Sequence, residues 1–372
     1  MRKFTTWRVT LLLTTALLMT NCVSGGGPAA PATGNANGGA TGPTAARPKK
    51  GPNEPVKIGF SMDTLKEERW QRDKELVEKR AKEVGAEVLI EVANGDDKLQ
   101  INQAENLLTK NVDVLIVAPH NGEVAASIVE AAHRQGVPVI SYDRLIKNSD
   151  VDLYVSHQVV KIGEMQAKYL LDKAPRGNYV IVQGAPTDNN ARLLHVGHMN
   201  VLQPAVDSGA IKIVANQPAK EWQASAALDI VENALTKANN DIVAVVASND
   251  GTARGAVQAL KSQNLAGKVF VSGQDADLPS LTAIVQGDQT MTVYKPLQPL
   301  AYGAVDAAVK LARGEKPATT DTVNNGKLDV PAILYEPISV DKNNLVATIV
   351  KDGYQTLEKI CAGVPADKCP KQ

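Results

Sequence analysis

The sequence predicts an α/β fold made of two doubly wound parallel-sheet lobes. Short valine-rich segments alternate with amphipathic segments of helical length along residues 56–313, which is the pattern of a parallel sheet covered by helices. The alternation restarts near residue 162, so two similar halves are expected. Polar residues follow most of the apolar segments, and in an open α/β sheet the carboxyl ends of the strands form the ligand-binding edge.

Composition and charge limit the classes of function. A chain of 372 residues with 44% hydrophobic residues can build two domains of ordinary size. The net charge is zero, but the first 50 residues hold six basic and no acidic residues, which leaves 34 basic against 40 acidic residues in the rest. A mildly acidic body argues against nucleic-acid binding, which usually requires a basic surface.

The amino end predicts export. Arg2, Lys3 and Arg8 precede an apolar run at residues 9–19, which has the length of a signal peptide and is short for a membrane span. The run ends in LMTNC, which resembles the lipobox of bacterial lipoproteins, so residues 1–22 are interpreted as a signal peptide with Cys22 acylated. A plain secretory signal is the alternative. Residues 23–55, rich in Gly, Ala, Pro and Thr, predict a flexible linker.

The first half supplies the elements of one lobe. Strands are expected at residues 56–61, 86–92, 112–118, 138–141 and 151–156, with helices between the first four. Arg69 and Trp70 stand near the start of the first helix, and Arg144 follows the fourth strand.

The second half repeats the pattern. Strands are expected at residues 179–183, 212–215, 242–247, 269–272 and 291–294, followed by a final strand pair at 330–340. Polar residues and a tryptophan follow these strands: Asp188, Asn190, Trp222, Asn249, Asp250, Asp275 and Lys295. For Asp250 a helix cap, and for Asp275 a turn, is the alternative to ligand binding.

We expect three chain crossings between the lobes, near Ser156, Lys295 and Pro331. The first lobe then contains residues 56–157 and 296–330, and the second contains residues 158–295 and 331–358. Residues 359–372 form a tail that contains CAGVPADKC, in which Cys361 and Cys369 could close a small disulfide loop. Such a bond fits an oxidising compartment, and two free thiols are the alternative.

The residue types favour a neutral, polar ligand. Trp70 and Trp222 each stand beside charged residues at a helix start, one in each half. Aromatic rings stack on the apolar faces of a sugar, while carboxylates, amides and cations serve its hydroxyls. The alternatives are tryptophans that only cover helix ends and an anion site built from Arg69, Arg144 and Lys295.

Catalysis and cofactors find little support in the sequence. No GxSxG, GxxxxGK[ST] or strand-following GxGxxG motif is present. His195 and His198 have helical spacing, but a solvated helix face is the preferred interpretation over a metal site. Asp250 and Asp275 are the only carboxylate pair that we would test for glycoside hydrolysis. We therefore expect a protein that is not an enzyme and that uses no cofactor or metal.

A set of motifs occurs in a fixed order along the chain. The motifs are ERWQRDKE (68–75), ISYDRLI (140–146), TDNNARL (187–193), VVASNDGTARGAVQAL (245–260), VSGQDADL (271–278) and QTMTVYKP (289–296). Together they resemble the family of periplasmic sugar-binding proteins of the ribose/galactose type, and within it the D-xylose-binding branch that serves bacterial ABC transporters. The likeness covers residues 56–356. It implies two lobes that close on one monosaccharide, expected to be D-xylose.

The resemblance also implies the sugar-binding residues and the partners. The sugar contacts would be Arg69, Trp70, Arg144, Asp188, Asn190, Trp222, Asn249, Asp275 and Lys295. The partners would be the ABC permease subunits and, through Cys22, the membrane, with the protein a monomer in the periplasm or at the outer face of the cell membrane. His120 stands where relatives often have Tyr. A receptor for another sugar, or a sugar sensor for chemotaxis or a histidine kinase, would use the same site.

Overall fold

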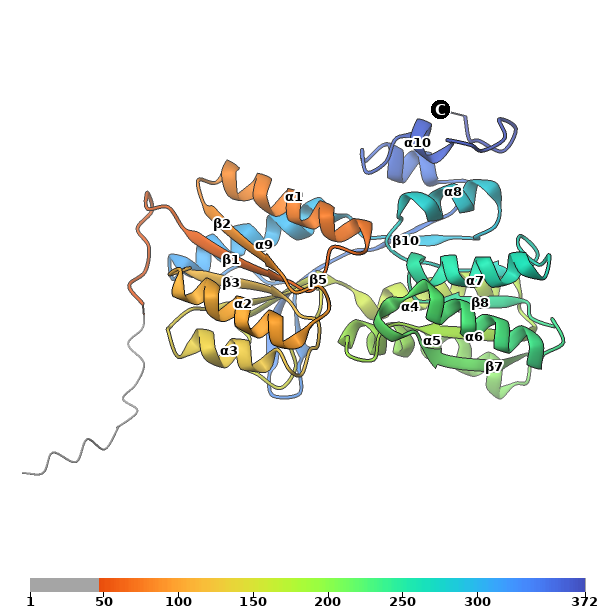
Figure 1. Cartoon of the computed structure of the whole chain (residues 1–372), viewed down its shortest axis with the longest axis horizontal. Coiled ribbons are helices and arrows are strands. Elements are labelled where there is room, and N and C mark those ends of the chain that lie inside the picture. The colour runs from red at the N-terminus through yellow and green to blue at the C-terminus, as the bar shows by residue number, and fades with distance from the viewer. Residues whose placement is uncertain (1–46, 372) are drawn as a thin grey trace, which may run out of the picture. The chain divides into compact units, whose positions relative to one another are not determined.

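The computed structural model describes residues 47–371. The expected signal peptide, its acylation site Cys22 and residues 23–46 of the expected linker lie outside the described residues. Residues 47–371 form two α/β lobes, joined where the chain crosses from one to the other (Figure 1).

Within the described residues, the first lobe contains a seven-stranded sheet in the order β11-β12-β5-β4-β3-β1-β2. All neighbouring strands are parallel except β11 and β12. The strands are β1 (Lys57–Met62), β2 (Glu87–Val92), β3 (Val114–Ala118), β4 (Val139–Tyr142), β5 (Leu153–His157), β11 (Asp321–Asn324) and β12 (Asp329–Tyr335). The helices of this lobe are α1 (Glu68–Glu83), α2 (Asp97–Thr109), α3 (Ala126–His133) and α9 (Leu297–Ala312).

The second lobe contains, among the described residues, a four-stranded parallel sheet in the order β7-β6-β8-β9 and a separate antiparallel pair, β10-β13. The strands are β6 (Gly177–Gln183), β7 (Ile211–Pro218), β8 (Ala244–Ala247), β9 (Phe270–Val271), β10 (Thr292–Tyr294) and β13 (Ile338–Val340). The helices are α4 (Val159–Lys173), α5 (Asn189–Asp207), η1 (Lys220–Trp222), α6 (Ala224–Lys237), α7 (Asp250–Ser262) and α8 (Leu278–Gln286).

Central strands such as β3 and β8 are buried on both faces, which explains why they are apolar throughout. In β3, Ile116 packs into the core beneath α1 and α9, whereas its neighbours Leu115 and Val117 pack beneath α2 and α3. In the second lobe, Val180 faces the core beneath α6 and α7, and Ile181 faces that beneath α4 and α5. Successive side chains along each strand therefore point alternately into the two cores.

The chain passes from the first lobe to the second after β5, returns after β10 and crosses again after β12. The boundary expected near Pro331 is wrong by several residues, because β12 continues to Tyr335 and pairs with β5 in the first sheet. The expected final strand pair is also wrong: β12 and β13 belong to different sheets, and β12 pairs instead with β11, which the sequence did not indicate. Helix α8 was likewise not expected.

The linker is shorter than expected at its carboxyl end. Residues 47–52 contact the first lobe: the Arg47 guanidinium donates to Val112 O, Lys50 N donates to Ala312 O at 3.0 Å, and Arg313 donates to Pro52 O at 2.8 Å. This part of the expected linker is therefore bound to the folded body.

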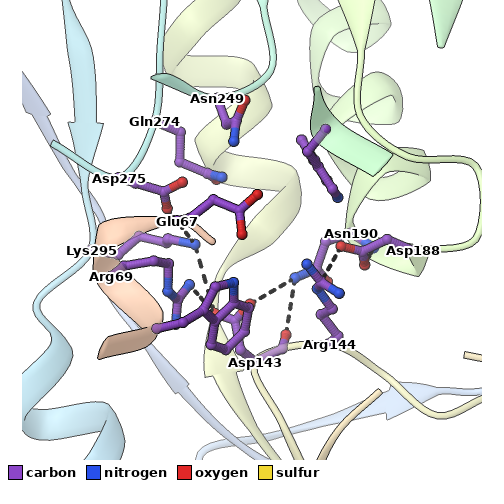
Figure 2. A pocket seen from close by; sticks show the side chains of 12 residues that line it. Glu67, Arg69, Asp143, Arg144, Asp188, Asn190, Asn249, Gln274, Asp275 and Lys295 are labelled. Carbon is purple, nitrogen blue, oxygen red and sulfur yellow. Dashed lines mark hydrogen bonds and ion pairs between the residues drawn. The ribbon is translucent and has the colours of Figure 1, made fainter. Parts of the chain in front are cut away.

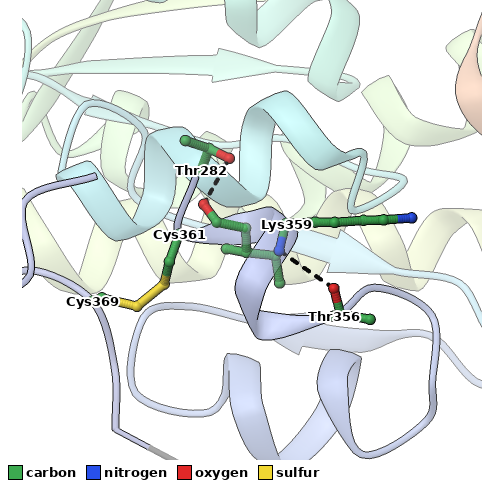
Figure 3. Close-up of a disulfide and its surroundings, with 6 residues drawn as sticks. Thr282, Thr356, Lys359, Cys361 and Cys369 are labelled. Atoms are coloured by element: carbon green, nitrogen blue, oxygen red, sulfur yellow. Dashed lines mark hydrogen bonds between the residues drawn. A yellow bond between two sulfur atoms is a disulfide. The ribbon is translucent and has the colours of Figure 1, made fainter. Parts of the chain in front are cut away.

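The second lobe ends in a carboxyl-terminal segment, residues 341–371, that contains η2 (Val346–Val350) and α10 (Leu357–Ile360). Cys361 and Cys369 are joined as a disulfide with their Cα atoms 5.9 Å apart (Figure 3). Among the helices of residues 47–371, none has the length and apolar character that a bilayer crossing requires.

Candidate ligand-binding site

A pocket lies where the strand ends of the two lobes meet (Figure 2). All nine residues expected to contact a ligand line this pocket. They are Arg69, Trp70, Arg144, Asp188, Asn190, Trp222, Asn249, Asp275 and Lys295. Three further side chains complete the lining: Glu67, Asp143 and Gln274.

Arg69 is held by two carboxylates of its own lobe. Its guanidinium donates to Asp143 at 2.7 Å and to Asp73, one helical turn further along α1, at 2.8 Å. All three side chains are buried. Burial alone would raise the pKa of Asp143, but the charges of Arg69 and Lys295 hold that pKa well below its usual range. Arg69 is therefore a fixed, charge-compensated donor at the pocket wall.

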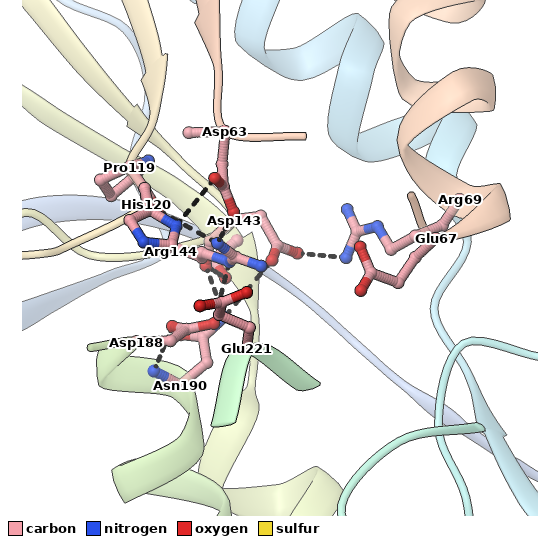
Figure 4. A network of polar contacts seen from close by, with 12 residues as sticks. Asp63, Glu67, Arg69, Pro119, His120, Asp143, Arg144, Asp188, Asn190 and Glu221 are labelled. Atoms are coloured by element: carbon pink, nitrogen blue, oxygen red, sulfur yellow. Dashed lines mark hydrogen bonds and ion pairs between the residues drawn. The ribbon is translucent and has the colours of Figure 1, made fainter. Parts of the chain in front are cut away.

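Arg144 links the two lobes. Its Nη1 donates to Asp63 at 2.6 Å in the first lobe, and its Nε lies 2.8 Å from Asp188 in the second (Figure 4). Asp63 in turn contacts Nδ1 of His120 at 2.9 Å. His120 therefore lies behind Arg144, and a series of polar contacts runs from His120 through Asp63 and Arg144 to Asp188 in the pocket lining.

Helix starts position three side chains of the second lobe. Asp188 is the N-cap of α5 and accepts from Asn190 N at 2.8 Å. Asn190 Nδ2 reaches across to Asp143 O at 3.0 Å. Asn249 caps α7 in a reciprocal capping box with Thr252. Each cap fixes the side chain at the strand-end edge, since the helix amino terminus lies there.

Lys295 completes the charged lining. It follows β10, and its ammonium lies 3.0 Å from Asp275 and 3.7 Å from Asp143. Lys295 is buried, as are both carboxylates. Each of the three cations in the pocket wall thus already has a carboxylate partner. A pocket balanced in this way favours a neutral ligand with hydroxyl groups over an anion, because no cation in the lining lacks a counter-charge.

The two tryptophans occupy different lobes. The Trp70 ring lies beneath two guanidinium groups, with the Arg69 and Arg144 carbons 4.3 and 5.2 Å from its centroid. Trp222 packs on Gly184, where an added Cβ would lie 2.0 Å from the indole. The absence of a side chain at Gly184 is thus what lets the Trp222 indole lie at the pocket wall.

Three lining residues have left-handed backbone conformations: Asp143 (φ 61°), Trp222 (φ 57°) and Asp275 (φ 102°). Such conformations cost non-glycine residues about 1–3 kcal/mol each and persist only where the surroundings impose them. They also turn the chain at the strand ends, so that adjacent residues such as Asp143 and Arg144 both line the pocket.

Two interpretations from the sequence need correction. Asp250 does not line the pocket but is buried behind it, where it accepts from Thr292 Oγ1 and Gln289 Nε2 at 2.9 Å each. Burial and the neighbouring carboxylates raise its pKa. His198 is not on a solvated helix face: it is buried, with Nε2 2.7 Å from Gln166 Oε1, and burial lowers its pKa to about 3.

Among residues 47–371, no cluster of three or more His, Cys, Asp or Glu side chains is arranged to hold a metal ion. Of the three lining residues that were not among the expected contacts, Asp143 and Gln274 each directly precede a residue that was. Glu67 directly precedes α1, and only its place before the ERW motif could have indicated it.

Two α/β lobes with polar residues converging on a shared pocket define a two-lobed solute-binding protein. Residues 58–316 match the periplasmic binding protein domain, and the chain belongs to this family. It is 50% identical to the D-xylose-binding periplasmic protein of Haemophilus influenzae over an alignment of 305 residues. This alignment covers 82% of this chain and 92% of that protein. The Escherichia coli protein of the same name is 50% identical over 299 residues, 80% of this chain and 91% of that protein.

Solved structures agree with this assignment. The carbohydrate transporter solute-binding protein of Chloroflexus aurantiacus, in complex with D-glucose, aligns with a TM-score of 0.78 at 33% identity, covering 82% of this chain and 98% of that one. An ABC transporter solute-binding protein of Clostridium phytofermentans with bound β-D-glucose aligns with a TM-score of 0.77 at 30% identity, covering 82% and 99%. The chain is therefore a periplasmic solute-binding protein and not an enzyme.

Proposed function

We propose that this chain captures one monosaccharide, D-xylose, between its two lobes and delivers it to the permease of an ABC transporter. The observation that carries the proposal is the pocket itself, in which every cation has a carboxylate partner and two indoles stand among the polar groups. A sugar has apolar ring faces and a polar edge of hydroxyls, each of which can donate and accept.

Buried polar atoms in the lining support a ligand with several hydroxyls. Within the described residues, Glu67 Oε2, Asn190 Oδ1 and Trp222 Nε1 are buried and have no hydrogen-bond partner. Buried polar atoms are rarely left unpaired in native proteins because each costs about 1–3 kcal/mol. One donor and two acceptors at the pocket wall therefore match the hydroxyls of a sugar.

The choice of D-xylose rests on the relatives. Two D-xylose-binding periplasmic proteins are 50% identical to this chain over at least 80% of its length. D-Glucose differs from D-xylose by an added hydroxymethyl group. Comparing the affinities for these two sugars therefore tests whether the pocket has room for that group.

The amino end supports a specific location for the receptor. The chain acts in the periplasm or at the outer face of the cell membrane, anchored by a lipid on Cys22. Mass spectrometry of the protein purified from membranes tests the anchor: an acyl group on Cys22 as the first residue is expected, and it is lost in Cys22→Ser. An unmodified, soluble mature protein would contradict it.

Titration calorimetry with D-xylose, D-ribose, D-glucose, arabinose and galactose tests the proposed ligand. We expect one-to-one binding, tightest for D-xylose. Tighter binding of another sugar would keep the receptor and reject D-xylose. If folded protein bound none of the five, the monosaccharide receptor itself would be rejected.

A further inference from the structure

A second set of contacts joins the lobes outside the pocket lining. Glu68, in α1 of the first lobe, accepts hydrogen bonds from two places in the second lobe. Leu278 N, at the start of α8, donates to Oε2 at 3.0 Å, and Gln355 Nε2, in the carboxyl-terminal segment, donates to Oε1 at 2.6 Å. Burial would raise the pKa of Glu68, but these bonds and Arg72 keep it below its ordinary value, so the carboxylate is charged at neutral pH.

These contacts belong to one face of α1. Glu68, Arg72 and Leu76 are spaced four residues apart and so share a face of the helix. The Arg72 guanidinium lies 4.5 Å from the Tyr354 ring centroid and 2.7 Å from Glu68, and Leu76 packs against the apolar cluster of α8 and the carboxyl-terminal segment. The first lobe thus presents a charged and apolar stripe to a complementary surface of the second.

The carboxyl-terminal segment also touches the pocket from behind. The Tyr354 hydroxyl donates to Asp275 O at 3.2 Å, and the Tyr354 ring lies 5.0 Å from that of Tyr294 in β10. Asp275 has a left-handed backbone and pairs with Lys295. Tyr354 therefore supports the backbone of a lining residue, while the next residue, Gln355, binds the opposite lobe.

The segment is fastened to its own lobe by several bonds. Thr282 Oγ1, in α8, donates to Ile360 O at 2.9 Å, and Lys368 Nζ donates to Gln286 O at 2.8 Å. The Cys361–Cys369 disulfide closes the chain between these two anchor points. These bonds hold the segment against α8, so the contact of Gln355 with Glu68 also connects α8 to α1.

We propose that Gln355 and Tyr354 form a latch that engages Glu68 and Arg72 only when the lobes are closed, and that this latch slows release of the ligand. The inference rests on the proposed function, because it assumes that the lobes close on a sugar. Contacts that exist only in the closed state stabilise that state and slow its opening, whereas the encounter of the sugar with the open cleft does not involve them.

Stopped-flow tryptophan fluorescence with D-xylose tests the latch, since Trp70 and Trp222 both line the pocket. Gln355→Ala is expected to raise the dissociation rate constant about tenfold, the size expected for loss of a hydrogen bond to a charged group, with the association rate constant unchanged. Lys351→Ala, at an exposed position of the same segment, is the matched control and should leave both rate constants unchanged.

Exchanging the charge between positions 355 and 68 distinguishes a latch from a merely structural role of Gln355. Gln355→Glu places a second carboxylate beside Glu68 and should raise the dissociation rate constant further, and adding Glu68→Gln should restore much of the wild-type value. An unchanged dissociation rate in Gln355→Ala, or no recovery in the double variant, would overturn the latch while leaving the receptor intact. If the wild-type protein bound no sugar, the proposed function would fail and the latch with it.

Discussion

Arg144, which follows β4 in the first lobe, and Asp188, the N-cap of α5 in the second, form an ion pair 2.8 Å apart beside the pocket. Their side chains are only 7% and 3% exposed. Arg144 also pairs with Asp63 on its own lobe, so one cation neutralises a carboxylate from each side of the pocket. This arrangement makes the charge balance between the two lobes depend on Arg144.

Replacement of Arg144 tests this dependence. Arg144→Ala would leave Asp188 buried without a cation and Asp63 with His120 as its remaining partner, and breaking a buried pair in this way costs about 3–5 kcal/mol. We expect at least a hundredfold rise in the Kd for D-xylose by calorimetry. Lys168→Ala, which removes a pair whose side chains are 69% and 61% exposed, should change the Kd little. Similar values of Kd for both variants would contradict the assigned role.

Asp275 and Trp70 test the site in a different way. Asp275→Ala removes the partner of Lys295, and Trp70→Ala removes the ring beneath Arg69 and Arg144. Each variant should lose detectable sugar binding while circular dichroism still reports a folded α/β protein. Trp70→Ala should also lower the free energy of unfolding by about 3–5 kcal/mol, because the ring is buried in the core of the first lobe. Unchanged affinity in both variants would reject the site assignment.

A single methyl group at Gly184 should displace Trp222. A Cβ at this position would lie 2.0 Å from the indole, so Gly184→Ala cannot be accommodated without moving the ring. We expect the affinity to fall at least tenfold, with a change in intrinsic tryptophan fluorescence. Gly251→Ala is the matched control, because its nearest neighbour, Trp222 O, lies at 3.4 Å. Equal effects of the two variants would argue against a role for the Trp222 ring.

His120 predicts a pH-dependent contribution to stability. Its hydrogen bond to Asp63 is the main reason that its pKa is raised in the folded protein, although burial and Arg144 oppose the shift and Asp97 supports it. A raised pKa contributes stability fully below the unfolded value of about 6.5, and the contribution disappears as the pH rises through the folded pKa.

The comparison is therefore between wild type and His120→Gln in urea unfolding at pH 5.5 and pH 9. The wild-type advantage in free energy of unfolding should be larger at pH 5.5. An advantage that did not change with pH, or that grew towards pH 9, would show that protonation of His120 does not stabilise the fold.

The sequence predicted the class of fold because the alternation of elements follows directly from burial on both sheet faces. It placed one crossing wrongly, near Pro331. Pro331 instead lies within β12, where its neighbours Val330 and Ala332 are buried in the first lobe. Pairing between β12 and β5 joins residues about 180 positions apart, and no local pattern reports such a partner.

The site was predictable to the extent that strand ends converge on one edge. Asp143 and Gln274, which were not among the expected contacts, show the limit of that reasoning, because strand geometry sends adjacent side chains to opposite faces. The positive φ angles at Asp143 and Asp275 break the alternation and bring both neighbours to the pocket. The burial of His198 depends on how closely α4 and α5 approach, where Cβ atoms on Gly163 and Gly197 would meet backbone at 2.2 and 2.1 Å.

The left-handed backbones of Asp143, Trp222 and Asp275 limit what selection experiments can recover at these codons. Glycine would relieve about 1–3 kcal/mol of backbone strain at each position. It would also remove a buried carboxylate that pairs with a cation, at Asp143 and Asp275, or a buried indole, at Trp222, and such losses cost about 3–5 kcal/mol. A library screened only for heat resistance should therefore retain the original residues at all three codons, even when no sugar is supplied.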